Sequence, residues 1–464
     1  MLLVWVAANV LACSSLSRIE SAFYKNSALS NMNPAPQSMT PPEIQDENGP
    51  IVDTVYMRSQ ADYHFTMGEA YSLEGRSEKA IEEFKLTLVY DPASAMVRMR
   101  LAAEYIRQGL LSEAIEQTEA AVEAEPENID AKMLLGGLYS SLKMYDMALK
   151  QYKLILKQSP DNTDAPIFIG AILAEKNQLS DAIVYFKALA ENKKYKEPQK
   201  AWYYVGRIHL EKNQKDSAEY AKKAYLKAIQ IDPSFSEAVL ALATLYETEG
   251  QKKKSVKLLE SYQEKFGPNK EVAKQLSRTY LEDQKYDEAF SQLEIIEGYE
   301  RSNLNVKLQM ALIMIEQKRY QEAAIRLEDI MVEAPESDKI RYYLGAVYEE
   351  LKEDDEAVKN FKRVPSSSPY YPEAVILAAN IVKKKSGSQP AAEMVKEAIG
   401  YRDDIPQFYA FYAALLDELK EYSQAVKMLN AAVARFPSHA QLRFFLGSMH
   451  DRLGEKEETI ENMK

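Results

Sequence analysis

One pattern of residue types returns every 34 positions along most of this 464-residue chain. Repeats start at positions 61, 95, 129 and 163 and, after a shift in register, at 236, 270, 304, 338, 372, 406 and 440. The eighth position of the period is usually a small residue, the eleventh is mostly Tyr, the twentieth is Ala and the thirty-second is often Pro. Examples of the four columns are Gly68, Gly136, Ala311 and Gly345; Tyr105, Tyr139, Tyr280 and Tyr348; Ala80, Ala148, Ala289 and Ala357; and Pro92, Pro126, Pro335 and Pro369. Such a period restricts the chain to a repeat architecture.

Each column has a physical role in a pair of antiparallel helices. Small residues at the eighth and twentieth positions let the two helices approach closely, and the Tyr fills the space beside them. Pro has no backbone N–H and closes the second helix. Two helices of about 13 residues, each roughly 20 Å long, cannot bury their apolar faces alone, so neighbouring pairs must stack. The columns therefore predict an all-α solenoid of helix-turn-helix units.

The pattern resembles the tetratricopeptide repeat (TPR) family. This resemblance implies a right-handed superhelical solenoid of about twelve repeats that binds proteins and performs no chemistry of its own. Repeats 1–4 occupy residues 61–198 and repeats 6–11 occupy 236–439, while an incomplete twelfth repeat occupies 440–464. The fifth repeat, 199–235, is three residues longer than the period, so we expect a bend or a partner-specific surface within 190–235.

The amino terminus differs from the repeats. Residues 1–12 are mostly apolar and are interpreted as a signal peptide, because an apolar run from Leu2 to Ala12 is too short to span a bilayer. The run ends at Cys13, the only cysteine, in a sequence that resembles the lipobox of bacterial lipoproteins, which implies that Cys13 is lipidated. The segment lacks the usual Lys or Arg, so an ordinary cleaved signal or a buried apolar tail remain alternatives. Residues 13–60, rich in Ser, Asn, Pro and Gln, are predicted to be a disordered tether.

Motifs for chemistry are missing from the sequence. The four histidines have no metal-ligand spacing, and His209 and His450 occupy the eleventh column, where packing is the expected role. We therefore expect no enzyme activity, no cofactor and no metal. The net charge of −12 argues against a nucleic-acid partner, because phosphate backbones require a basic surface.

The resemblance places a binding groove along the first helix of each repeat, at its second, fifth, sixth, ninth and twelfth positions. The carboxylate clamp of the family's chaperone adaptors and the asparagine ladder of its glycosyltransferases are both absent from these positions. Large apolar residues and one arginine occupy them instead: Phe65, Met99, Met133, Ile167, Tyr203, Tyr204, Arg207, Leu240, Leu308, Tyr342, Tyr343 and Phe411. The second position is mostly acidic, as at Asp62, Asp130, Glu237 and Glu373. An apolar floor with acidic flanks predicts a protein partner that presents an amphipathic helix or extended segment with apolar anchors and basic residues, although packing against the adjacent repeat is an alternative role for the sixth position.

Two functions of different classes agree with these features. The first is a protein-binding scaffold, attached to the membrane only through its lipid, that organises a bacterial cell-envelope assembly as an outer membrane lipoprotein facing the periplasm. The alternative is the recognition arm of an enzyme, a glycosyltransferase or protease, whose catalytic domain lies beyond residue 464.

Overall fold

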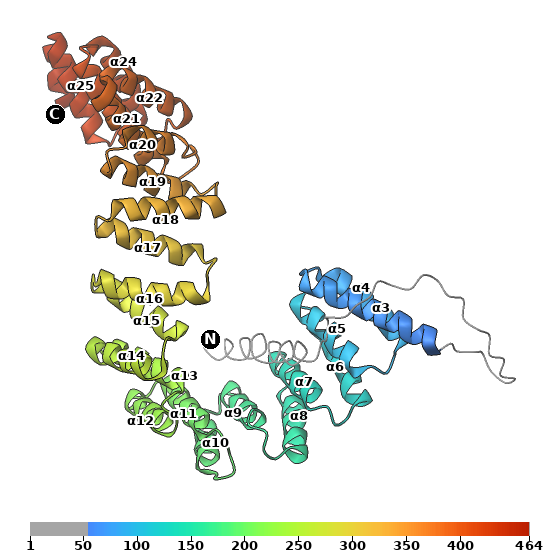
Figure 1. The fold of residues 1–464 in the computed structure, drawn as a ribbon. Coiled ribbons are helices and arrows are strands. Elements are labelled where there is room, and N and C mark those ends of the chain that lie inside the picture. Colours follow the sequence, from blue (N-terminus) through green and yellow to red (C-terminus); the bar gives the residue numbers. More distant parts are fainter. Residues whose placement is uncertain (1–53, 464) are drawn as a thin grey trace. The chain divides into compact units, whose positions relative to one another are not determined.

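The computed structural model describes residues 54–463, which form twenty-four α-helices and no strand (Figure 1). The helices form antiparallel pairs, and consecutive helices contact each other from α3 to α13 and from α15 to α26, so the predicted all-α solenoid of helix-turn-helix repeats is confirmed. The signal peptide, Cys13 and most of the predicted tether lie outside the described residues. Residues 54–60, which the sequence assigned to the tether, are helical, because the first helix begins at Thr54 rather than at residue 61.

The chain divides into two compact units, Met1–Leu258 and Leu259–Lys464. The helices of the first unit are α3 (Thr54–Leu73), α4 (Ser77–Tyr90), α5 (Ala95–Arg107), α6 (Leu111–Ala124), α7 (Ile129–Ser141), α8 (Tyr145–Gln158), α9 (Ala165–Glu175), α10 (Leu179–Glu191), α11 (Pro198–Lys212), α12 (Ser217–Ile231) and α13 (Ser236–Thr248). The boundary falls within α14 (Lys252–Phe266).

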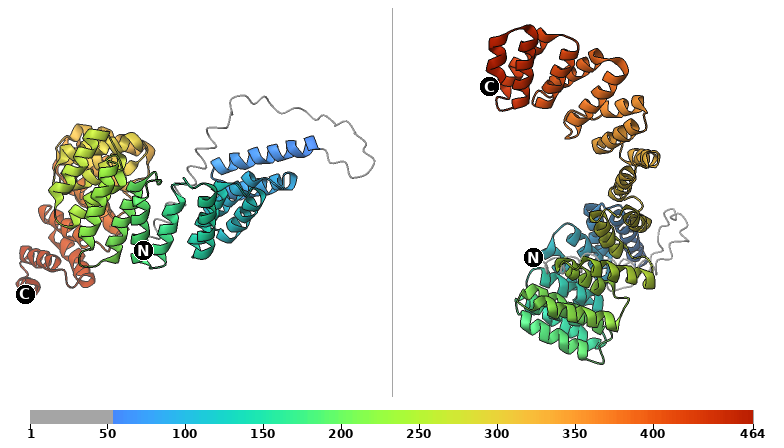
Figure 2. Two further views of the ribbon diagram at one scale, coloured as in Figure 1. Left: turned by 90° about the horizontal axis from the view of Figure 1, so that it is seen from below. Right: turned by 90° about the vertical axis from the view of Figure 1, so that its left-hand side faces the viewer.

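The second unit continues the same alternation of helices. It contains α15 (Lys270–Glu282), α16 (Tyr286–Tyr299), α17 (Leu304–Glu316), α18 (Tyr320–Glu333), α19 (Asp338–Glu350), α20 (Asp354–Lys362), α21 (Tyr371–Ser386), α22 (Ser388–Tyr401), α23 (Pro406–Glu418), α24 (Tyr422–Arg435), α25 (Ala440–Leu453) and α26 (Lys456–Met463). Two further views show these helices stacking in chain order within the unit (Figure 2). None of the helices among residues 54–463 is both long and apolar enough to cross a bilayer.

Local signals start and stop the helices of a repeat. The residue before the first helix often caps it, as where the Asn128 side chain accepts a hydrogen bond from the Ala131 N–H at 2.9 Å. The turn after the first helix contains a residue with positive φ, either Gly, as at Gly109, or a residue such as Lys318. These short connections hold consecutive helices antiparallel.

The eighth position is small because an aromatic ring of the second helix lies against it. A Cβ atom at Gly345 would lie only 2.7 Å from Cδ1 of Phe361, and Gly170 and Phe186 have the same relationship. Where the eighth residue is Ala, the residue at the ring's position is smaller than an aromatic ring: it is Leu327 for Ala311 and Thr118 for Ala102. The two columns are therefore complementary in size, as close packing requires.

The enlarged fifth repeat takes up its three additional residues around the turn between its helices. Helices α11 and α12 have 15 residues each, whereas α5 and α6 have 13 and 14. Nineteen residues separate Gly206 from its ring partner Tyr225, whereas sixteen separate Gly345 from Phe361. The insertion therefore lies between Gly206 and Tyr225, and the packing of that glycine against the ring is retained.

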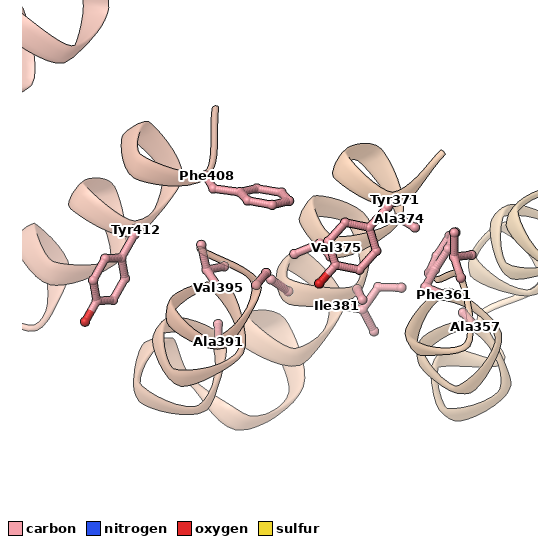
Figure 3. Packing of buried hydrophobic residues seen from close by; sticks show 14 of the residues in the cluster. Ala357, Phe361, Tyr371, Ala374, Val375, Ile381, Ala391, Val395, Phe408 and Tyr412 are labelled. Carbon is pink, nitrogen blue, oxygen red and sulfur yellow. The ribbon is translucent and has the colours of Figure 1, made fainter. Parts of the chain in front are cut away.

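The ninth repeat departs from the pattern in its second helix. Helix α20 has only 9 residues and ends at Lys362, well before Pro369, because Pro365 has no N–H to continue it. The chain then reaches α21 through a loop in which Ser368 is buried and its Oγ accepts a hydrogen bond from the Tyr370 N–H at 3.1 Å. Figure 3 shows Phe361 of α20, Tyr371 at the start of α21 and Phe408 of α23 within one apolar core.

Candidate functional site

The predicted groove residues are more enclosed than an open apolar floor would be. At the fifth position Met99, Ile167 and Leu308 are buried, with exposed fractions of 8%, 8% and 7%. The remaining predicted residues are half-buried: Phe65, Met133, Tyr203, Tyr204, Arg207, Leu240, Tyr342, Tyr343 and Phe411. A partner can reach only the half-buried members without a rearrangement of the helices.

Aromatic residues at the sixth position pack against the preceding repeat. Tyr204 stacks on Phe186 of α10 with ring centroids 5.1 Å apart and an interplanar angle of 12°. Phe168 stacks on Tyr152 of α8 at 5.1 Å and 8°. Burial raises the pKa of Tyr204 to about 12. These contacts give Phe168 and Tyr204 a packing role, which is the alternative that the sequence left open for this position.

A cluster of aromatic side chains, here called the Tyr203 cluster, surrounds the fifth position of the enlarged repeat. The Tyr203 ring lies 5.4 Å from Tyr204, 5.9 Å from Tyr225 and 5.7 Å from Phe235, measured between centroids. Phe235 is the last residue of the enlarged repeat and directly precedes α13. The cluster therefore lies at the junction with the next repeat, at the position predicted for partner binding.

A second group, the Tyr342 cluster, has the same composition in the second unit. The Tyr342 ring lies 5.5 Å from Tyr343, 6.1 Å from Phe361 and 5.3 Å from Tyr370. Tyr370 directly precedes α21, as Phe235 precedes α13. Three of the four aromatic positions therefore correspond between the clusters. The fourth does not, since Tyr370 lies one position earlier in its repeat than Phe235 and stacks on Tyr342 at 25°, whereas Phe235 meets Tyr203 edge-on at 86°.

Carboxylates accompany both clusters at the second position of the following repeat. Glu237 acts electrostatically on the Tyr203 hydroxyl, and Glu373 acts in the same way on the Tyr342 hydroxyl. Burial, together with the nearby Glu373 carboxylate, raises the pKa of Tyr342 above its usual range. Both glutamates are exposed, so each cluster has a negative edge open to solvent.

The clusters differ at the ninth position of their first helices. In the first unit this residue is Arg207, whose guanidinium carbon lies 5.7 Å from the centroid of the Tyr203 ring. In the second unit it is Ala346. Arg207 forms no ion pair with a carboxylate of residues 54–463, and its guanidinium lies beside the Tyr203 ring.

Sequence analysis did not identify Phe235, Tyr370, Tyr225 or Phe361 as members of these groups. The first two lie in loops, where helical periodicity gives no signal, although both directly precede the first helix of a repeat. The other two, Tyr225 and Phe361, lie against the eighth-position glycines, so their position in the repeat indicates a core role rather than a role in the groove.

The histidines contribute to packing and pairing in the described part of the chain. His209 stacks on Tyr220 with centroids 5.1 Å apart, and burial lowers its pKa. Nδ1 of His450 lies 2.5 Å from a carboxylate oxygen of Glu455. Among residues 54–463 no three His, Cys, Asp or Glu side chains are grouped so that they could hold a metal ion.

Comparisons with known proteins identify the repeat. A tetratricopeptide repeat model matches residues 99–163 and 413–461, and a second model of the same repeat matches 340–369. No curated protein matches the sequence. Among solved structures, the chain is similar to one in the structure of Naa15/Naa10 bound to HypK-THB, at 14% identity and a TM-score of 0.30, over 87% of this chain and 68% of that one. It is also similar to YrrB, described as a TPR protein with an unusual peptide-binding site, at 23% identity and a TM-score of 0.31, over 40% of this chain and 94% of that one. The chain thus contains tetratricopeptide repeats.

Proposed function

We propose that the chain is a protein-binding scaffold whose first helices bind a segment of a partner protein. The observation that carries the proposal is the half-buried aromatic surface at the fifth position, exemplified by Tyr203 and Tyr342, beside the exposed carboxylates Glu237 and Glu373. Aromatic rings provide large contact areas at the centres of interfaces, and the carboxylates favour a basic partner. Tetratricopeptide repeats and the net charge of −12 agree with this proposal.

The finer part of the proposal concerns location. We infer that Cys13 is lipidated, and that the scaffold is thereby attached to the outer membrane and faces the periplasm, where it organises a cell-envelope assembly. The support is the apolar run that ends at the only cysteine of the chain. Its partner is an amphipathic helix or an extended segment that carries apolar anchors and basic residues.

Site-directed photo-crosslinking tests the binding surface. Gln309 is exposed at the sixth position of α17, next to Leu308, and Val332 is exposed on α18 of the same repeat. A photoreactive phenylalanine at residue 309 should capture a discrete protein in cells, whereas the same group at residue 332 should not. Capture from residue 332 alone would show that the first helices are not the binding surface.

A further inference from the structure

The two aromatic clusters differ by one charged side chain, and that difference identifies a ligand. In the first unit Arg207 brings a guanidinium to within 5.7 Å of the Tyr203 ring, and Glu237 also acts on that tyrosine. A cation beside an aromatic face with a carboxylate nearby is a favourable arrangement, since the ring quadrupole and the carboxylate both attract positive charge. The Tyr203 cluster thus contains its own cation.

The Tyr342 cluster also has four aromatic rings and a nearby carboxylate, but it has no cation of its own, and its fourth ring, Tyr370, stacks on Tyr342 rather than meeting it edge-on. Ala346 stands where Arg207 stands in the first unit, and no Lys or Arg of residues 54–463 lies over the rings of Tyr342, Tyr343 or Tyr370. The charged groups that act on the Tyr342 hydroxyl are the carboxylates of Glu373 and Glu349. A half-buried aromatic surface with negative groups at its edge is therefore open at this position.

We propose that the Tyr342 cluster binds a basic side chain of the partner, preferably arginine, in the place that Arg207 occupies in the Tyr203 cluster. This inference rests on the proposed scaffold function and specifies the chemistry of one contact. Arginine is favoured over lysine because its planar guanidinium can stack on a tyrosine and donate to Glu373 at the same time. The alanine at residue 346 leaves room for the incoming group.

Two substitutions exchange the ninth-position residues of the two clusters. Ala346→Arg should place an internal guanidinium against Tyr342 and exclude a partner's basic side chain. Arg207→Ala should remove the internal cation from the Tyr203 cluster and open a second site. Position nine tolerates both residue types, because each already occurs there in one unit. The gain of a site in Arg207→Ala is a result that misfolding cannot produce.

The test uses calorimetry on the full chain with a defined probe, the blocked peptide acetyl-Leu-Ala-Arg-Ala-Leu-amide. The control peptide has citrulline, which is neutral and similar in shape, in place of arginine. The unaltered chain should bind one equivalent of the arginine peptide, Ala346→Arg should bind none, Arg207→Ala should bind two and the double variant should bind one. The citrulline peptide should bind about fivefold or more weakly, as expected from the loss of a cation–π contact.

Either of two results would overturn the inference. One is equal binding of the arginine peptide by the unaltered chain and by Ala346→Arg, with circular dichroism showing that both are folded. The other is equal binding of the arginine and citrulline peptides. After either result, capture of a protein by photo-crosslinking at residue 309 would still support the scaffold function. Failure of this inference can therefore be distinguished from failure of the proposed function.

Discussion

The Tyr280 hydroxyl donates a hydrogen bond to a carboxylate oxygen of Glu260 at 2.5 Å, which links the first helix of one repeat to the second helix of the repeat before it. Tyr348 donates to Glu328 in the same way. In the first unit Lys85 stands in the place of the glutamate, 20 residues before Tyr105, and its ammonium lies 5.8 Å from the centroid of the Tyr105 ring. The eleventh column therefore forms a contact between repeats as well as filling space beside the small residues.

Removing the hydroxyl of Tyr280 should weaken this contact between repeats. Tyr280→Phe should lower the free energy of unfolding by about 1 kcal/mol, because a hydrogen bond to a charged but exposed carboxylate is lost. Chemical denaturation measures the change. The matched variant is Tyr246→Phe, whose ring faces Lys222, and its stability should change by less than about 0.5 kcal/mol. Equal losses in the two variants would contradict a specific role for the carboxylate.

The size match between Gly345 and Phe361 predicts that a second substitution can restore stability lost through the first. Gly345→Ala should destabilise the chain by about 1 to 3 kcal/mol, because its methyl group overlaps the ring. Adding Phe361→Leu should recover part of the loss, since Ala with Leu is the pair present at Ala311 and Leu327. Gly298→Ala is the control: nothing lies within 4 Å of its Cβ position, so it should stabilise by about 0.5 to 1 kcal/mol. Thermal or chemical unfolding measures the stability of each variant. The size match would be refuted if the stability changes of Gly345→Ala and Phe361→Leu simply added in the double variant.

The pKa of Glu300 predicts a pH dependence of stability. Hydrogen bonds from Asn303, Lys270 and Lys274 hold this pKa at about 2, below the ordinary value of 4.5. A carboxyl whose pKa is lower in the folded state stabilises that state above its ordinary pKa and loses the contribution as pH falls towards the folded value. Glu300→Gln should therefore make stability fall less steeply between pH 4.5 and about 2. Glu264→Gln, at an exposed glutamate of the same unit, should leave the slope unchanged in denaturation curves recorded across this range.

The proposed membrane anchor depends on one residue. Cys13→Ala should move the protein from the membrane fraction to the soluble periplasm, because three acyl chains hold a lipoprotein firmly and none would remain. Fractionation and the mass of the mature protein measure the effect. Lipidation would be contradicted if the variant stayed in the membrane fraction. It would also be contradicted if the mass of the unaltered mature protein showed no added acyl chains.

Periodicity could predict the fold because the packing partners recur at fixed distances. Gly345 and Ala357 were identified from their columns alone, and both lie against the core in the structure. The exposure of the groove residues could not be predicted in this way, because it depends on neighbouring side chains from another repeat. Met99 and Tyr342 share the fifth position, yet one is buried and the other is half-buried.

Irregular segments limited the sequence prediction of the site. Tyr370 belongs to the Tyr342 cluster only because α20 ends early and the following loop brings the ring onto Tyr342. Neither the early end of α20 nor the path of this loop recurs every 34 residues, so the repeat pattern could not predict them. The same holds for Phe235, which reaches Tyr203 from the loop before α13. A search for aromatic residues directly before the first helix of each repeat would have found both.

The role of the two tyrosines at the cluster centres can be tested directly. Tyr203→Ala and Tyr342→Ala should each weaken binding of the crosslinked partner by about 1 to 3 kcal/mol, as for aromatic anchors at the centre of an interface. Each change also removes ring contacts within its own cluster, so melting temperatures must be measured on the same variants.

Tyr342→Phe separates stability from recognition at this position. It keeps the ring contacts with Phe361 and Tyr370 and removes only the hydroxyl on which the Glu373 carboxylate acts. Its stability should therefore change by less than about 1.5 kcal/mol, while Glu373 remains available to a basic partner. We expect Tyr342→Phe to retain most of the partner affinity that Tyr342→Ala loses. A fall in stability for Tyr342→Ala with unchanged partner affinity would mean that this ring only packs, and the enlarged repeat within residues 190–235 would then be the next surface to test.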